Sequence, residues 1–130
     1  MFYDFFKAFG KVCMKTHKDL DVWKKSVDFV TDVYQITNTF PNHELYGIVN
    51  QIRRAAVSIP SNIAEGAARK HKKEFVHYLH VALGSMAELE TQLIISQKLN
   101  YLDEKKFTEL NGKLNLIRRE LIGLIKYLTK

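Results

Sequence analysis

The sequence predicts an all-α protein folded as an up-down-up-down antiparallel four-helix bundle, left-handed, with a proline-kinked second helix. Apolar residues recur at steps that alternate between three and four, the 3.5-residue repeat of helices packed at a shallow left-handed angle. No segment shows the sustained alternation of apolar and polar residues that is typical of strands. The length of 130 residues, with 46% hydrophobic and 26% charged residues, suits one compact domain with a core of its own.

The N-terminal segment, residues 1–16, is expected to be an extension of the bundle domain at residues 17–130. Four phenylalanines at helical spacing favour a short helix docked on the bundle or on a partner, or a weak membrane-surface contact. The equally weighted alternative is a disordered upstream extension, with Met14 as the natural start. The segment lacks the charged start of a signal peptide, and no uncharged apolar run is long enough to span a membrane. The single cysteine, Cys13, excludes an intrachain disulfide and fits a reducing, cytoplasmic location.

Four apolar stripes predict the four helices, and short loops between them make neighbours antiparallel. Pro41 ends the first helix, residues 66–71 separate the second from the third, and Asp103 can cap the fourth. The stripes are Leu20, Trp23, Val27, Val30 and Tyr34; Leu45, Ile48, Ile52, Ala55 and Ile59; Phe75, Leu79, Ala82, Met86, Leu89 and Leu93; and Phe107, Leu110, Leu114, Ile117, Leu121, Leu124 and Leu128.

The second helix contains Pro60, which leaves the carbonyl of Ala56 without its usual donor, so a kink is expected. Small residues around it keep the helix surface low, and Gly84-Ser85 on the third helix could supply a matching flat spot. On physical grounds this segment serves packing rather than catalysis.

The first helix carries a second apolar stripe, roughly 120° around from the first. One stripe would face the bundle and the other a second subunit, so we expect an oligomer interface. The alternative is a wide core face covered by the N-terminal segment. The interface residues expected are Val22, Phe29, Val33, Ile36 and Phe40.

Residues 53–73 hold six cationic side chains against one carboxylate, Glu65, and so account for nearly all of the formal net charge of +6. Cations at the start of the third helix oppose its macrodipole, which suggests that they are kept for an anion such as phosphate. The competing interpretation is a solvated basic turn without a ligand. The nucleic-acid-binding residues expected are Arg53, Arg54, Arg69, Lys70, Lys72 and Lys73.

Enzyme chemistry is not expected, and neither is a catalytic residue, a metal or another cofactor. Glu74 and His77 have the Glu-x-x-His spacing of di-iron bundles, but the sequence has no second pair of this kind. There is no glycine-rich phosphate loop, and Ser58 and Ser61 lack the strand-turn-helix setting of a nucleophile.

Several motifs together resemble the four-helix-bundle protein family encoded within intervening sequences of bacterial 23S ribosomal RNA genes. The resemblance covers about residues 19–128, and its long middle motif is unusual. The motifs are DLDVWKK at 19–25, FPNHELYG at 40–47, QIRRAAVSIPSNIAEG at 51–66, Glu74-Phe75, Gly84-Ser85 and ELET at 88–91.

This family is similar to the accessory variability protein of diversity-generating retroelements, a pentameric bundle that engages a reverse transcriptase and nucleic acid. The resemblance implies a four-helix bundle, a ring-shaped homo-oligomer (a pentamer above all) and a basic surface suspected of binding nucleic acid; it implies no established activity. Relatives usually have Ser where His71 stands, three residues before Glu74, which would form a capping box. His71 cannot cap in this way, at a cost of ~1 kcal/mol.

Three hypotheses follow for function. The first is a non-enzymatic homo-oligomer that binds structured RNA or an RNA–DNA hybrid. No base-reading module or exposed aromatic platform occurs among the six cationic residues, so we expect backbone- and shape-dominated, salt-sensitive binding. The second is a scaffold for a protein partner, for example a polymerase. The third is a structural oligomer in which Arg53, Arg54 and Glu65 form interface ion pairs.

Overall fold

The computed structural model describes residues 16–130, which form four long helices with two short 3-10 helices and no strand. The prediction of an all-α four-helix bundle is therefore confirmed. Residues 1–15, with Cys13 and the expected N-terminal helix, lie outside the described part of the chain. The helices are η1 (His17–Asp19), α2 (Asp21–Thr37), η2 (Asn42–Glu44), α3 (Ile48–Ala67), α4 (Lys72–Lys98) and α5 (Glu104–Leu128).

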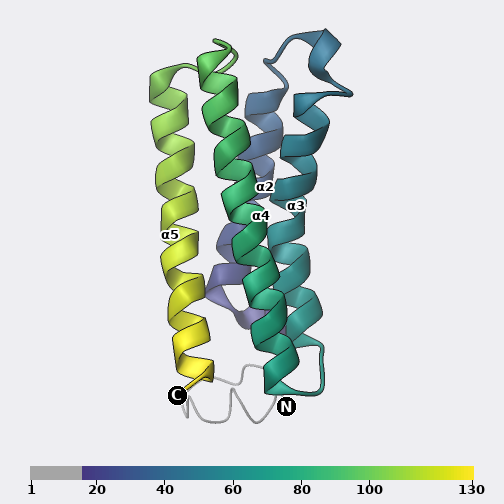
Figure 1. Ribbon diagram of the computed structural model, residues 1–130, viewed down its shortest axis with the longest axis vertical. Helices are drawn as coiled ribbons and strands as arrows, with labels where there is room; N and C mark the ends of the chain where they lie inside the picture. The colour runs from purple at the N-terminus through teal and green to yellow at the C-terminus, as the bar shows by residue number, and fades with distance from the viewer. Residues whose placement is uncertain (1–15) are drawn as a thin grey trace.

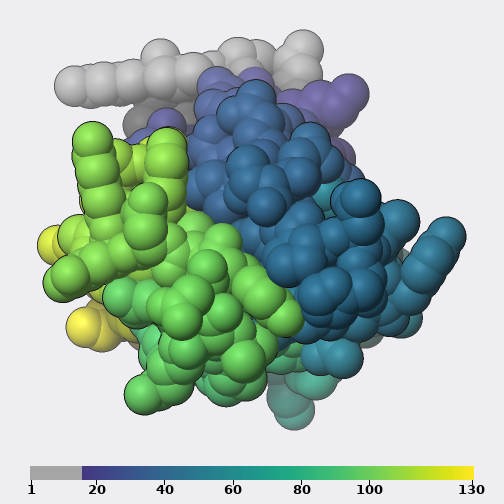
Figure 2. Space-filling model, turned by 90° about the horizontal axis from the view of Figure 1, so that it is seen from above, coloured from purple at the N-terminus to yellow at the C-terminus, as the bar shows by residue number. Residues whose placement is uncertain are grey.

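Successive long helices run in opposite directions along a common axis (Figure 1). Each packs against its sequence neighbours, and α2 also packs against α5, so the four surround one core. The α2–α3 and α4–α5 connections share one end of the bundle, where they lie against each other (Figure 2). The α3–α4 connection lies at the opposite end.

The core of α3, α4 and α5 follows the predicted stripes. Every residue of the predicted third stripe is buried, from Phe75 to Leu93, as are Leu110, Leu114, Ile117 and Leu121 of the fourth. Ile48, Phe107 and Leu124 are partly buried against this core, and Leu45 is exposed, because η2 and a turn precede α3 and leave its side chain half exposed.

Capping residues account for the start of α5 and the end of α4. Asp103 caps α5 as predicted, since its Oδ1 accepts a 2.7 Å hydrogen bond from the Lys106 amide. Asn100, at φ 63°, ends α4 with a left-handed residue, and the amide of Tyr101 donates to the carbonyl of Ser96 at 2.9 Å. This is the Schellman arrangement, which satisfies carbonyls left free at a helix end.

The assignment of faces on α2 is wrong. Val22, Phe29, Val33 and Phe40, predicted to form a subunit interface, are buried in the bundle's own core, and Ile36 packs against that core. Ser26 and Thr37 share this face, and their hydroxyls donate to the carbonyls of Trp23 and Val33, both at 2.8 Å. These internal hydrogen bonds let two polar residues occupy a core stripe at little cost. The stripe predicted to face the core is the more exposed one. Leu20 is buried as predicted, but Trp23, Val27 and Val30 are only partly buried and Tyr34 is exposed.

Pro60 lies within α3, which stays helical from Ile48 to Ala67, and the predicted kink stays a prediction. The Asn62 amide donates to the Ser58 carbonyl at 2.7 Å, and the hydroxyls of Ser58 and Ser85 lie 2.8 Å apart. Ser85 thus provides the expected close contact between α3 and α4. Gly84 does not, because a Cβ placed on it would meet nothing within 4 Å.

Ion pairs link α2 to α5 along the bundle surface. Lys25 pairs with Glu120 and, at 3.0 Å, with Asp21, while Lys113 pairs with Asp32 at 2.7 Å. The hydrogen bond from Lys25 lowers the pKa of Asp21, and the bond to Glu120 is the main cause that raises the pKa of Lys25.

Candidate nucleic-acid interface

The six predicted cationic residues do not form one patch, which corrects the picture of a single basic cluster. Arg53 and Arg54 lie on α3 near the α2–α3 connection, whereas the other four occupy the α3–α4 connection and the start of α4 (Figure 1). The 14 residues between Arg53 and the end of α3 separate the two sets by about 20 Å, at 1.5 Å per residue. The two sets are therefore two separate candidate sites.

Arg53 is bound within the protein. Its Nε donates to Thr37 Oγ1 at 3.0 Å and its Nη2 to Asn38 Oδ1 at 2.9 Å, both at the end of α2. Nη2 also lies 3.5 Å from the carbonyl of Tyr34, and the guanidinium stands 4.6 Å from the centre of the Tyr34 ring. Arg53 thus supplies donors and positive charge to the C-terminal end of α2, where free carbonyls and the macrodipole favour both.

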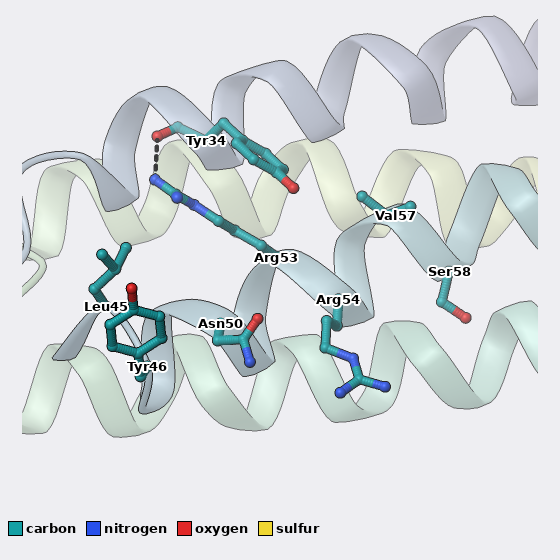
Figure 3. Close-up of a pocket in the computed structure, with 8 residues that line it drawn as sticks. All are labelled: Tyr34, Leu45, Tyr46, Asn50, Arg53, Arg54, Val57 and Ser58. Carbon is teal, nitrogen blue, oxygen red and sulfur yellow. Dashed lines mark hydrogen bonds between the residues drawn. The ribbon is translucent and has the colours of Figure 1, made fainter.

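Arg54, the next residue, is exposed, and its side chain forms no hydrogen bond or ion pair within residues 16–130. It lines a surface groove of about 730 Å³ that is walled by α2, the α2–α3 connection and α3 (Figure 3). Within the described part of the chain, none of the lining residues carries a carboxylate. They are Tyr34, Leu45, Tyr46, Asn50, Arg53, Arg54, Val57 and Ser58.

This set, which we name the tyrosine–arginine groove, contains the aromatic surface that sequence reasoning missed. Tyr46 is 91% exposed and Tyr34 40% exposed. Both tyrosines lie outside the six cationic residues, among which no aromatic platform is expected, but they line the same groove as Arg53 and Arg54. In the sequence, Tyr46 of the FPNHELYG motif lies eight residues before Arg54, where a loop leads into a helix. This proximity of an aromatic and a cationic residue was the signal from which the groove could have been predicted.

The second set is the α3–α4 turn, of which Arg69 is the paired member. Its Nη2 donates to Glu65 Oε1 at 2.5 Å and to the Tyr78 hydroxyl at 2.7 Å, and the guanidinium lies 4.9 Å from the centre of the Tyr78 ring. The bond to Glu65 is the main cause that raises the pKa of Arg69. Glu65 thus has an ion-pair partner inside the chain, and Arg53 has hydrogen-bond partners, while the hypothesis that Arg53, Arg54 and Glu65 form ion pairs between subunits stays a prediction.

Lys70, Lys72 and Lys73 are the unpaired members of the α3–α4 turn. All three are exposed, and none makes an ion pair with another residue of the described chain. His71 between them is the N-cap of α4 and its side chain makes no capping hydrogen bond, as predicted. The turn therefore presents three free cations beside uncapped backbone amides, a combination suited to an anion.

Groups for other chemistry do not assemble in residues 16–130. No three His, Cys, Asp or Glu side chains come close enough there to hold a metal ion. Within the same residues, no helix has both the length and the apolar character that crossing a membrane requires.

Comparison with known proteins agrees with the fold. A family model described as 23S rRNA-intervening sequence protein matches residues 18–123. A crystal structure from Bacteroides thetaiotaomicron, described as a protein of unknown function from the S23 ribosomal protein family, is 25% identical. It superposes with a TM-score of 0.75 over 81% of this chain and 98% of that one. No protein with a curated description matches. The matched residues take in α2, α3 and α4 whole and most of α5, and the chain belongs to the 23S rRNA-intervening sequence protein family.

Proposed function

We propose that this protein is a cytoplasmic, non-enzymatic homo-oligomer that binds structured RNA, or another nucleic acid, through its exposed cations. The observation that carries the proposal is the α3–α4 turn, where Lys70, Lys72 and Lys73 are exposed at a helix start and form no ion pair with any described residue. Cations there oppose the macrodipole and repel one another, so they cost stability in the absence of an anion. The family description, which refers to 23S rRNA, makes RNA the favoured nucleic acid.

Oligomerisation is proposed on two grounds. The family resemblance implies a ring, most simply a pentamer, and α4 displays large aliphatic side chains on its outer surface. Val81, Ile94, Ile95 and Leu99 are each at least 38% exposed. Burying such side chains between copies would be favourable by about 25 cal/mol per Å².

The experiment is fluorescence anisotropy of a labelled RNA hairpin over a series of salt concentrations. Lysine contacts to phosphates release counterions, so the logarithm of the binding constant should fall linearly with the logarithm of salt concentration. The Lys70→Glu/Lys72→Glu/Lys73→Glu variant should bind at least 10-fold more weakly and with a shallower slope. Arg69 stays unchanged, because its bonds to Glu65 and Tyr78 are structural.

A matched variant controls for net charge. Lys98→Glu/Lys105→Glu/Lys106→Glu replaces three exposed lysines at the opposite end of the bundle, and it changes the net charge by the same amount. It should retain most of the affinity, and both variants should keep the wild-type mass in light scattering. If both variants lose the same affinity, the effect comes from overall charge and not from the α3–α4 turn. If the anisotropy of the RNA does not rise with wild-type protein at low salt, RNA binding is refuted.

A protein scaffold is the second candidate, and the exposed aliphatic side chains of α4 favour it. In that case a partner, for example a reverse transcriptase, would cover Ile94, Ile95 and Leu99. Retention of a partner after nuclease treatment, and its loss in an Ile94→Asp/Ile95→Asp variant that keeps the wild-type mass in light scattering, would support this candidate over RNA binding.

A further inference from the structure

We propose that the tyrosine–arginine groove binds an unpaired nucleotide, with its base stacked on Tyr46 and its phosphate held by Arg54. This inference rests on the proposed nucleic-acid function and adds to it a second, separate contact that recognises single-stranded rather than duplex segments. The groove volume of about 730 Å³ lies within the range of small-ligand sites, roughly 300–1,000 Å³.

Tyr46 is the first reason. It is the most exposed large hydrophobic side chain in the described structure, at 91%, and it lies in the α2–α3 connection at the end of the groove (Figure 3). A ring so exposed contributes almost nothing to the stability of the fold. Its faces are open to a second planar group, and every nucleobase offers such a group.

The charge of the groove is the second reason. Arg53 and Arg54 both line it and no carboxylate of residues 16–130 does, so the groove attracts anions. Arg53 is held by Thr37 and Asn38, whereas Arg54 has no partner in residues 16–130 and keeps all its donors free. A guanidinium offers forked donors that fit a phosphate.

Asn50 provides the third reason, because it lies one helical turn before Arg54 and so on the same face of α3. Its exposed amide can donate to and accept from a base edge, and Leu45 and Val57 add half-exposed apolar surface beside it. Aromatic ring, free guanidinium and free amide together are the elements with which proteins hold unstacked bases.

A duplex does not fit this arrangement, because its bases are already stacked and turned inward. The groove would therefore act on a loop or a single-stranded tail. The α3–α4 turn, about 20 Å away along α3, would hold the phosphates of an adjoining stem. The two sites predict different substrate features and can be tested separately.

The test compares a blunt RNA duplex, which has no unpaired loop, with the same duplex carrying an oligouridine tail, by anisotropy at fixed salt. The tail should tighten wild-type binding, and Tyr46→Ala should remove about 5- to 100-fold of the affinity for the tailed RNA while leaving the affinity for the blunt duplex unchanged. Tyr46→Trp should restore the affinity, and its added fluorescence should be quenched by the tailed RNA alone. Arg54→Gln should weaken tail binding as well, and Ile122→Ala, another exposed apolar truncation, should change neither.

The outcomes separate this inference from the proposed function. If the wild type binds the blunt duplex and the tail adds nothing, the groove inference is overturned while the proposed function stands. If the wild type binds neither RNA, both are overturned. If Tyr46→Ala lowers the mass measured by light scattering, the groove is a contact between copies of the chain and the inference is wrong.

Discussion

The hydroxyl of Tyr101 donates a 2.9 Å hydrogen bond to Oε2 of Glu44, which binds the α4–α5 connection to the α2–α3 connection. The Tyr101 ring also lies 5.6 Å from the ring of Phe40, and Figure 2 shows the two connections in contact. This bond is the main cause that raises the pKa of Tyr101, and burial adds to it. A contact between residues 57 positions apart thus holds the two connections together at one end of the bundle.

The first prediction concerns alkaline pH. Because the pKa of Tyr101 is raised in the folded state, its contribution to stability is complete below the unfolded value of about 10 and is lost as pH rises through the folded pKa. In this window the unfolded chain has released the proton that the native state keeps, so the free energy of unfolding falls. Urea melts between neutral and alkaline pH should show a shallower decline in Tyr101→Phe than in the wild type. Identical slopes would contradict this role of the bond.

The second prediction separates the two adjacent arginines. Arg53→Ala removes charge-assisted hydrogen bonds to Thr37 and Asn38 and should lower the free energy of unfolding by about 1–3 kcal/mol. Arg54→Ala removes an exposed side chain without a partner in residues 16–130 and should change it by no more than about 0.5 kcal/mol. Chemical denaturation of both variants measures the difference. Equal destabilisation would show that Arg53 is not the structural member of the pair.

Most of the bundle could be predicted from the sequence, because burial on α3, α4 and α5 follows a single stripe per helix. On α2 two stripes are almost equally apolar, and periodicity alone cannot tell which one faces inward. The core stripe of α2 also includes Ser26 and Thr37, whose polarity makes it look like the weaker choice. Only the structure shows that their hydroxyls are satisfied by the helix backbone.

The candidate site could be predicted only in part. Lys70, Lys72 and Lys73 lie close together in the sequence and in the same turn of the structure, so the charge pattern of the sequence is enough to predict this part of the site. The tyrosine–arginine groove combines Tyr34 of α2 with Tyr46 of the connection and Arg54 of α3. Its formation depends on how α2 packs against α3, and the wrong face assignment for α2 therefore hid the groove.

The third prediction tests the close approach of α3 to α4. A Cβ at Gly66 would lie 2.8 Å from the Cβ of Tyr78 and 3.1 Å from the backbone oxygen of Phe75, so the two helix backbones would have to separate. Gly66→Ala should lower the free energy of unfolding by about 1–3 kcal/mol. Gly84→Ala is the control, because nothing lies within 4 Å of its new methyl and alanine gains about 0.5–1 kcal/mol in a helix interior. Thermal or urea unfolding should move in opposite directions for the two variants, and a shared direction would contradict the packing argument.

The fourth prediction uses the missing cap of α4. His71 occupies the N-cap with φ −115° and ψ 140°, the extended backbone that a capping residue adopts, yet its side chain makes no capping bond. His71→Ser would place a hydroxyl within reach of the Glu74 amide, while Glu74 at N3 can bond back to the amide of residue 71. The variant should raise the free energy of unfolding by ~1 kcal/mol, seen as a higher urea midpoint at an unchanged slope. His71→Ala, which also removes the imidazole but adds no acceptor, should show no such gain. An equal gain in both variants would mean that removing the imidazole, rather than supplying the cap, stabilises this end of the helix.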